Sequence, residues 1–154
     1  MGAHLRRGAA GLTGQAPAIV VHSLAHAVAA LGAATEARLP IALLSAPEAG
    51  LTVGPGWWRA LVDAGRAAVP DARFTAVLDC GDDSGAAQAA IRAGVKALVF
   101  TGRPDVIERL TAIAGQRGAT LLIERPAAAL DLGELFFADP ETLRRRCADV
   151  LASI

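Results

Sequence analysis

The chain has 154 residues, 15 basic and 15 acidic side chains, and an apolar content of 53% with 4% aromatic residues. This length fits one domain and is too short for a closed eight-stranded α/β barrel, which takes roughly 200 to 250 residues. Balanced charge without a basic stripe excludes a nucleic-acid-binding surface, and no apolar stretch is long enough to cross a membrane. The first residues lack the apolar core of a secretory signal, so we expect a cytoplasmic protein.

A short arm is predicted ahead of a single domain. Residues 1–16 are rich in glycine and alanine and show no period, which predicts a flexible N-terminal arm before an α/β domain at 17–154. Within that domain, apolar runs end in small or polar residues and pass into helix-like segments. The predicted strands are Ala18–His22, Ile41–Leu44, Phe74–Leu78, Ala97–Phe100 and Thr120–Ile123. Their spacing is typical of a strand-plus-helix repeat.

Helix signals follow the strands. Ser23 is a cap for the first helix, and Pro104 opens the helix that ends near Gly118. The proline- and glycine-rich stretch Ser45–Gly56 is predicted to be a long irregular loop before the second helix. Beyond Pro126 the pattern weakens. There, Leu130 to Phe137 fits either a short strand or a packing loop, and a final helix is predicted from Asp139-Pro140 to about Ala152.

Apolar strands that alternate with helices predict a parallel sheet. We expect a five-stranded parallel (βα)5 unit, a partial TIM-barrel-like fold, with a flavodoxin-like open doubly wound sheet as the alternative. A partial barrel leaves edge strands and an apolar inner face uncovered, which favours a homodimer. The C-terminal segment from Leu130 is an alternative cover within one chain.

Candidate catalytic residues follow the third and fifth predicted strands. Asp79 is a candidate general base or ligand for a sugar hydroxyl, and an aspartate at this position also caps its own turn. Cys80 is a candidate nucleophile or soft metal ligand, or a small buried apolar residue. Glu124 ends the fifth strand. His22 and His26 are spaced for one helical face, but no third metal ligand is evident, so capping or packing roles are the alternative.

Two glycine-bearing turns lead into helix N-termini, where backbone N–H groups favour anions. They are Gly81 to Gly85 and Thr101-Gly102-Arg103. Together with Arg103 or Arg125 they are predicted to hold a phosphate, although glycine also serves tight turns. Glu124 and Arg125 can instead pair with charged neighbours across the strand ends. The candidate ligand-binding residues in these segments are Gly81, Ser84, Thr101, Gly102, Arg103 and Arg125.

Two segments carry a family resemblance: Phe74-Thr-Ala-Val-Leu-Asp-Cys-Gly81 and Ala89-Ala-Ile-Arg-Ala-Gly-Val-Lys-Ala-Leu-Val-Phe100. In order and spacing they resemble the first half of the class II fructose-bisphosphate aldolase barrel, whose third strand reads His-x-Asp-His-Gly. The resemblance implies a lyase ancestry, with Asp79 at the catalytic acid/base and Ser45 beside the substrate. Val77 replaces the first motif histidine, and Cys80 replaces the histidine that binds the metal.

The remaining metal ligands of that family are also missing, because this chain has no histidine after His26. We therefore expect no cofactor, and a divalent metal has no supporting ligand histidines. Three functions stay open. The first is a noncatalytic or degenerate aldolase-like half-barrel that binds a small phosphorylated or sugar-like ligand at the strand ends. The second is a lyase or isomerase with altered chemistry that uses Asp79 with Cys80 or Glu124. The third is a structural or interaction module that forms a dimer.

Overall fold

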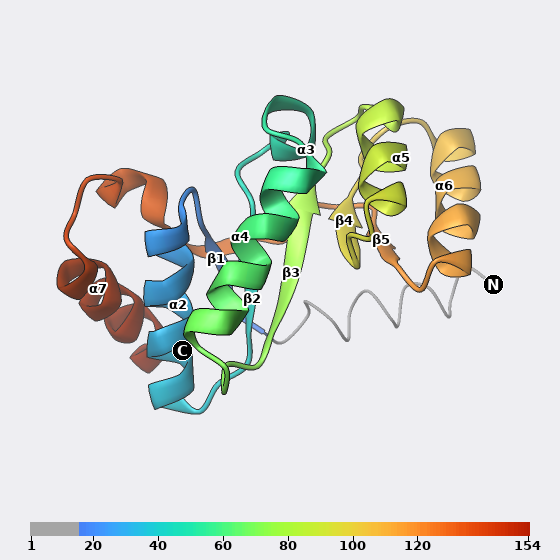
Figure 1. Cartoon of the computed structure of the whole chain (residues 1–154). Helices are drawn as coiled ribbons and strands as arrows, with labels where there is room; N and C mark the ends of the chain where they lie inside the picture. The colour runs from blue at the N-terminus through green and yellow to red at the C-terminus, as the bar shows by residue number, and fades with distance from the viewer. Residues whose placement is uncertain (1–15) are drawn as a thin grey trace.

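A computed structural model describes residues 16–154, so the predicted N-terminal arm lies almost entirely outside the described residues. All five predicted strands are present (Figure 1). A sixth strand, Ala128–Asp131, overlaps only the start of the segment Leu130 to Phe137 that the sequence left as a strand or a loop, and a 3-10 helix follows it there. The elements, in chain order, are β1 (Ala18–Val20), α2 (Leu24–Ala37), β2 (Ile41–Leu44), α3 (Ala49–Thr52), α4 (Pro55–Ala68), β3 (Phe74–Asp79), α5 (Ser84–Arg92), β4 (Ala97–Val99), α6 (Pro104–Gln116), β5 (Thr120–Leu122), β6 (Ala128–Asp131), the 3-10 helix η1 (Leu132–Leu135) and α7 (Pro140–Ala152).

All strand pairs are parallel, and the strand order is β5-β4-β3-β2-β1-β6. From β1 to β5 each strand lies beside the one before it, and β6 pairs with the free side of β1. The helices follow the same order, since α7 packs on α2, α2 on α4, α4 on α5 and α5 on α6. Such a single winding direction is that of a partial TIM-barrel-like fold, whereas a doubly wound sheet reverses direction and carries helices on both faces. The flavodoxin-like alternative is therefore wrong.

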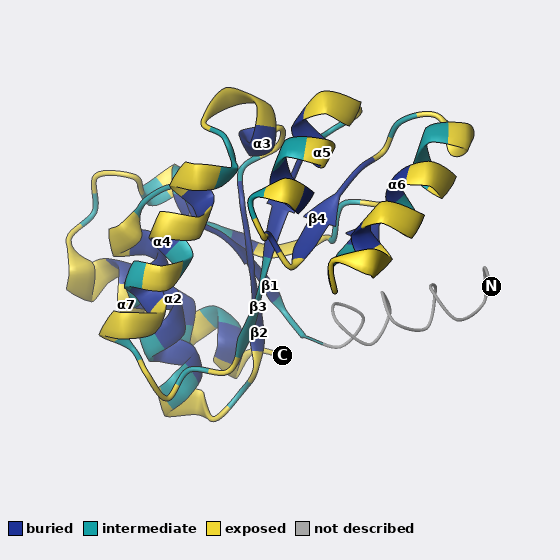
Figure 2. Cartoon of the chain, turned by 45° about the vertical axis from the view of Figure 1, so that its right-hand side comes forward, coloured by how far each residue is buried: buried dark blue, intermediate teal, exposed yellow. Residues whose placement is uncertain are grey.

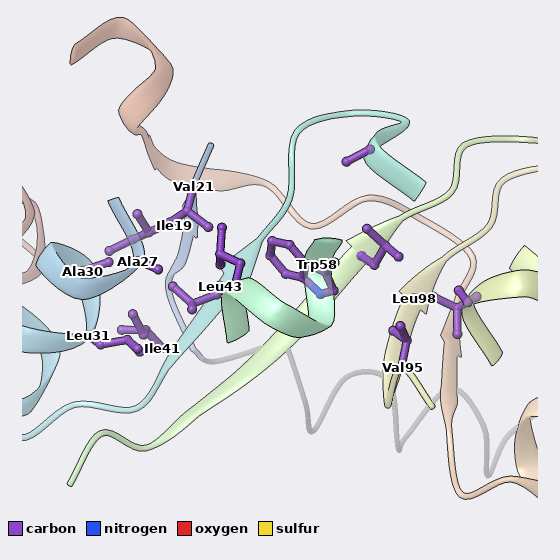
Figure 3. Packing of buried hydrophobic residues seen from close by; sticks show 14 of the residues in the cluster. Ile19, Val21, Ala27, Ala30, Leu31, Ile41, Leu43, Trp58, Val95 and Leu98 are labelled. Atoms are coloured by element: carbon purple, nitrogen blue, oxygen red, sulfur yellow. The ribbon is translucent and has the colours of Figure 1, made fainter. Parts of the chain in front are cut away.

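The two faces of the sheet bury different sets of side chains, as alternation along a strand requires. One set packs against the helices in the main core, which Figure 3 shows around Ile19, Leu43, Trp58 and Leu98. The other set forms a second buried cluster without any helix residue: Ala18, Val20, Ala42, Leu44, Val77, Ala97, Val99 and Leu122. Figure 2 shows buried strands behind helices whose outer faces are exposed. Alanine and valine make up most of the second cluster, which leucine completes.

The connection from β5 to β6 shows how strongly the sheet curves. In a flat sheet, strands spaced by roughly 4.8 Å would put β5 and β6 about 24 Å apart. Residues 123–127 join Leu122 to Ala128, and that many residues span at most roughly 20 Å. The connection must also return from the carboxyl end of one strand to the amino end of the other. The connection therefore crosses the concave side of a curved sheet, and the sheet stays open between β5 and β6. We call this crossing segment, residues 123–127, the chord.

Local signals explain the helix boundaries. The Ser23 side chain accepts a hydrogen bond from the His26 backbone N–H, as a capping residue should, and Pro55, Pro104 and Pro140 each open a helix. The structure differs from the prediction of an irregular loop at Ser45–Gly56, because the middle of this segment forms the short helix α3. Among residues 16–154, no helix is long and apolar enough to cross a membrane.

Candidate functional site

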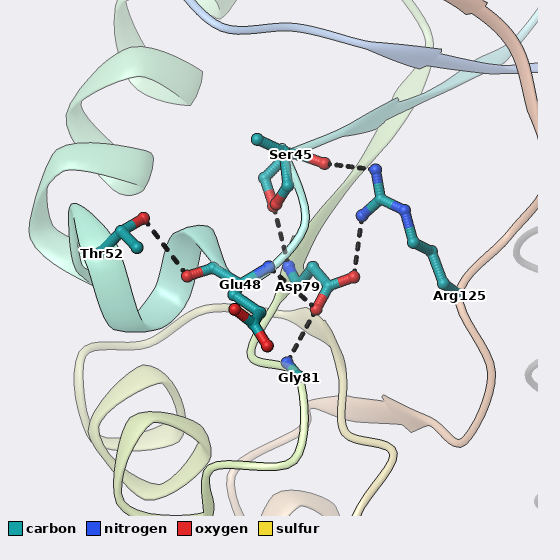
Figure 4. Close-up of polar contacts among 7 residues, drawn as sticks. Ser45, Glu48, Thr52, Asp79, Gly81 and Arg125 are labelled. Carbon is teal, nitrogen blue, oxygen red and sulfur yellow. Dashed lines mark hydrogen bonds and ion pairs between the residues drawn. The ribbon is translucent and has the colours of Figure 1, made fainter.

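Four of the predicted site residues meet at the carboxyl ends of the strands: Ser45, Asp79, Gly81 and Arg125. Ser45 follows β2, Asp79 ends β3, and Arg125 lies in the middle of the connection between β5 and β6. Figure 4 shows the hydrogen bonds that join them, together with Glu48. Parallel α/β folds bind ligands at this end of the sheet, so the cluster is the candidate site.

Asp79 is the centre of the cluster, and its side chain is engaged by three donors. Oδ1 accepts hydrogen bonds from the Gly81 N–H at 2.7 Å and from the Glu48 N–H at 3.3 Å. Oδ2 accepts one from Arg125 Nη1 at 2.8 Å. The residue is 4% exposed, so its charge is balanced mainly inside the chain. In this arrangement Asp79 positions the turn and the guanidinium.

At the end of the β2–β3 pairing, the hydroxyl of Ser45 accepts the hydrogen bond that its backbone carbonyl would normally accept. Its N–H donates to the Val77 carbonyl, so the next parallel bond would run from the Asp79 N–H to the Ser45 carbonyl. Instead the Asp79 N–H donates to Ser45 Oγ at 2.9 Å, and that hydroxyl donates to the Ala46 carbonyl at 2.9 Å. The Ser45 carbonyl is thereby freed, and it accepts a hydrogen bond from Arg125 Nη2 at 2.9 Å.

Gly81 permits the tight turn after β3. Its φ is +56°, and an added Cβ would lie 3.0 Å from Glu48 Cγ. Glu48 itself has a left-handed backbone with φ of +60°, which aims its N–H at Asp79. A single carboxylate therefore ties together the ends of β2 and β3, and the glycine is required for both conformation and space.

Arg125 is more accessible than Ser45 and Asp79, with 26% of its side chain exposed. Its two terminal nitrogens each donate one hydrogen bond, to Asp79 and to Ser45. A guanidinium has five N–H donors, and the remaining ones have no partner among residues 16–154, so they suit a hydroxyl or an anion. The sequence hypothesis that Arg125 pairs with a charge across the strand ends agrees with this geometry.

Cys80 points the opposite way from Asp79, because neighbouring strand residues face opposite sides. It is fully buried in the main core, and an added Cβ on Gly50 of α3 would lie 2.7 Å from its Sγ. Burial, followed by the charges of Asp79 and Asp83, raises the pKa of the Cys80 thiol to about 12. At neutral pH the thiol is protonated and lies apart from the cluster.

The other predicted residues surround the cluster without joining it. Glu124 is exposed and makes no hydrogen bond or ion pair with any residue in 16–154. Arg103 donates to Asp105 of its own helix. Thr101 is exposed, and its N–H donates to the Gly81 carbonyl at 2.8 Å, which holds the two turns together.

The helix N-terminus at Ser84 is already occupied by a carboxylate. Asp83 is the N-cap of α5, and its side chain accepts a hydrogen bond from the Ala86 N–H at 2.8 Å. Gly102 is required by packing, because an added Cβ would lie 2.4 Å from the Phe100 ring. These turns thus have internal reasons for their residue types, and Arg125 carries the free donors at this rim.

Sequence reasoning missed Asp131 and underrated His22. These residues follow β6 and β1, which are neighbours in the sheet, and they form a pair of 2.7 Å between His22 Nε2 and Asp131 Oδ1. Arg125 is close enough for its charge to help lower the pKa of Asp131. Only the pairing of β6 with β1 brings them together, and no local pattern predicts that pairing.

A cavity lies at the opposite end of the sheet from this cluster. It has a volume of about 530 Å³ and lies at the amino ends of β3, β4 and β5, beside α4, with Arg59, Asp63, Arg66 and Lys96 among its lining residues. We place the candidate site at the carboxyl ends instead, because the buried polar network is there and this fold class binds ligands there.

The metal centre that the aldolase resemblance implies does not fit the residues present. Val77 lies in the apolar inner cluster and Cys80 faces the helices. Within residues 16–154, no group of three or more histidine, cysteine, aspartate or glutamate side chains is arranged to hold a metal ion. No step of a mechanism is therefore derived through a metal at this site.

Comparison with solved structures shows what the chain is similar to. No protein-family model and no curated protein matches the chain. The chain is similar to the crystal structure of a protein from Coccidioides immitis that is assigned as a fructose-1,6-bisphosphate aldolase, with a TM-score of 0.57 and 22% sequence identity. The match covers 76% of this chain and 43% of that chain, so the chain spans less than half the length of its structural relative. The likeness shows an aldolase-like fold.

Proposed function

We propose that this chain is a degenerate aldolase-like half-barrel that binds a small phosphorylated or sugar-like molecule at the carboxyl ends of its strands. The observation that carries the proposal is the Arg125 guanidinium, which is fixed by Asp79 and Ser45 and still partly exposed. A prepositioned guanidinium loses little side-chain entropy on binding, and its free N–H donors suit phosphate oxygens and sugar hydroxyls.

Metal-dependent aldol cleavage is not part of this proposal. The two motif positions that would be histidines are Val77 and Cys80, and neither side chain joins the cluster around Asp79. The alternative of a lyase or isomerase based on Asp79 and Cys80 receives less support, because one side chain is engaged by three donors and the other is a protonated buried thiol.

A thermal-shift screen tests the binding function. Wild type, Arg125→Lys and Asp79→Asn are each melted with and without dihydroxyacetone phosphate, sugar phosphates, free sugars and inorganic phosphate. The proposal predicts a ligand-induced rise in Tm for wild type that shrinks in both variants, since each changes the position of the charged donors. Measuring the shift within each variant removes the effect of the substitution on stability. An equal shift in all three proteins, or none with any ligand, would contradict the proposal.

We further propose a homodimer, which the position of β5 and β6 at the two ends of the sheet among residues 16–154 supports. Both strands end the sheet, and Ile123, which follows β5, is 46% exposed. Unpaired strand edges are natural pairing surfaces. Light scattering after size exclusion should give twice the 15.7 kDa chain mass, and Ile123→Lys should shift the mass toward one chain. A monomeric wild type would contradict this part of the proposal.

A further inference from the structure

His22 and Asp131 form a second polar pair at the same end of the sheet, and the proposed binding function does not use it. His22 Nε2 lies 2.7 Å from Asp131 Oδ1, and the same oxygen accepts a hydrogen bond from the Gly133 N–H at 2.8 Å. An ionised carboxylate accepts hydrogen bonds only, so the imidazole proton lies on Nε2. The other ring nitrogen, Nδ1, is then the basic one, and it makes no hydrogen bond with any residue in the described part of the chain.

The backbone of His22 is held in place by a hydrogen bond to His26, and this helps to fix the position of the His22 ring. The His22 N–H donates to His26 Nδ1 at 3.1 Å, and His26 is completely buried. Burial, together with the nearby His22, lowers the pKa of His26 and outweighs the opposite effect of the Phe136 backbone, so His26 is a neutral acceptor. The rings of His22 and His26 meet edge to face at 5.8 Å.

Gly133 makes room for the pair. A Cβ at this position would lie 2.8 Å from His22 Nε2 and 3.0 Å from Asp131 Oδ1, so only glycine allows the backbone to approach both groups. Despite this close packing, 24% of the His22 side chain and 44% of the Asp131 side chain are exposed. A small molecule at the rim can therefore reach the imidazole.

The groups around Asp131 hold its carboxyl group in the charged form. Partial burial acts to raise the pKa of Asp131, but hydrogen bonds from His22 and Gly133 and the charges of His22 and Arg125 outweigh it and hold the pKa below its ordinary value. Asp131 is therefore ionised at neutral pH, and its Oδ1 accepts a hydrogen bond from the His22 Nε2–H. A histidine oriented by a carboxylate in this way is the arrangement that proteins use for general base catalysis.

We propose that His22 is a metal-independent general base at the strand ends and that Asp131 is its positioning residue. The substrate class is a small molecule whose reaction begins with removal of a proton from a hydroxyl group or from water. With p-nitrophenyl acetate as the probe, His22 Nδ1 takes a proton from water while the water oxygen bonds to the carbonyl carbon. The bond to the p-nitrophenyl oxygen then breaks, p-nitrophenolate leaves with the electron pair, and His22 releases its proton to solvent.

Hydrolysis of p-nitrophenyl acetate by the full chain tests the proposal. His22→Gln keeps a donor near the Nε2 position but removes the base, so it should lower the rate above buffer by about a hundredfold, the lower end of general base effects. Asp131→Asn should lower the rate several-fold. Asp71→Asn, which removes an exposed charge near the amino end of β3, is the matched control and should leave the rate unchanged. Equal rates in wild type and folded His22→Gln would overturn the proposal.

A spectroscopic measurement first tests the position of the imidazole proton in the wild-type chain. The nitrogen-15 chemical shifts of the His22 ring in wild type should report a proton on Nε2 and an unprotonated Nδ1. In Asp131→Asn this preference should weaken, which a merely structural aspartate would not cause. A wild-type ring with its proton on Nδ1 would overturn the proposal. The ligand-induced thermal shift depends on Arg125 and the hydrolysis depends on His22, so either function can fail while the other stands.

Discussion

Arg125 and Asp79 are 46 residues apart in sequence, and their ion pair of 2.8 Å joins the chord between β5 and β6 to the end of β3. The same guanidinium also donates to the Ser45 carbonyl. One side chain thus connects three separate parts of the chain at the end of the sheet where ligands of this fold class bind. The stability of the partial barrel and the geometry of the candidate site therefore both depend on the Arg125 side chain.

The strength of this contact can be measured with a double-mutant cycle of Asp79→Asn and Arg125→Ala. Each single variant leaves a group without its charged partner, and the Asp79 side chain is almost completely buried. We expect a coupling free energy of about 1–3 kcal/mol, the range for contacting charged residues. Urea unfolding followed by circular dichroism gives the four stabilities. Additive losses from the two substitutions would show that the pair does not join the chord to the sheet.

Ser45→Ala tests the hydroxyl that replaces a backbone acceptor. Without Oγ the buried Asp79 N–H loses its partner, so we expect the free energy of unfolding to fall by about 1–3 kcal/mol. Ser84→Ala is the matched control, because Ser84 is exposed at the start of α5 and Asp83 supplies the cap there. Comparable losses in both variants would remove the special role assigned to Ser45.

Two glycine substitutions should have opposite effects. Gly81→Ala places a Cβ at positive φ and against the Glu48 side chain, so it should destabilise the chain by about 1–2 kcal/mol. Gly115→Ala lies inside α6 with no atom within 4 Å of the new Cβ, and alanine should stabilise the helix there by about 0.5–1 kcal/mol. Thermal melts of the two variants check the signs. A stabilising Gly81→Ala would contradict the tight turn at Asp79.

The two buried cysteines should lower the free energy of unfolding as the pH becomes alkaline. Burial raises the pKa of Cys80 to about 12 and that of Cys147 to about 11, against an unfolded value of 9.0. A raised folded-state pKa means that stability is fully present below pH 9 and is lost as the pH rises toward those values, by about 1.4 kcal/mol per pH unit for each thiol. The chain has no tyrosine, so few other groups titrate in this window.

Unfolding by urea at a series of pH values from 7 to 10.5 measures this loss. The matched control is Cys80→Ala, which should reduce the slope of stability against pH although it lowers stability itself. Thiol reagents should also leave both cysteines of the native chain unmodified at pH 8, because both are buried. Rapid modification of Cys80 in the folded protein would support the nucleophile alternative instead.

The strands were predictable because their residues are apolar on both faces, and the structure places all five predicted runs in the sheet. The strand β6 left a weaker signal. Its sequence Ala-Ala-Leu-Asp pairs with β1 on one side only and buries little beyond Leu130. The sequence there was therefore equally compatible with a strand and with a loop. The short helix α3 was hidden in a proline- and glycine-rich stretch for a similar reason, since four residues give no helical period.

For the candidate site, local sequence could propose Asp79 and Ser45 from strand ends and a family resemblance. It could not propose that Arg125 reaches them, because that contact exists only when the sheet curves and the chord crosses its concave side. His22 and Asp131 illustrate the same limit: they are 109 residues apart and meet through the pairing of the first strand with the last. The catalytic and binding roles given to these residues stay predictions.

The measurement that tests the central claim most directly is a titration of the nitrogen-15-labelled chain with dihydroxyacetone phosphate, followed by NMR and repeated with inorganic phosphate. Binding at the strand ends predicts that backbone signals of Ser45, Gly81 and Arg125 shift together with saturation, and that Arg125→Lys weakens the effect. Shifts confined to Thr75, Val95 and Lys96, in the cavity at the opposite end of the sheet, or the absence of shifts at any concentration, would contradict the account.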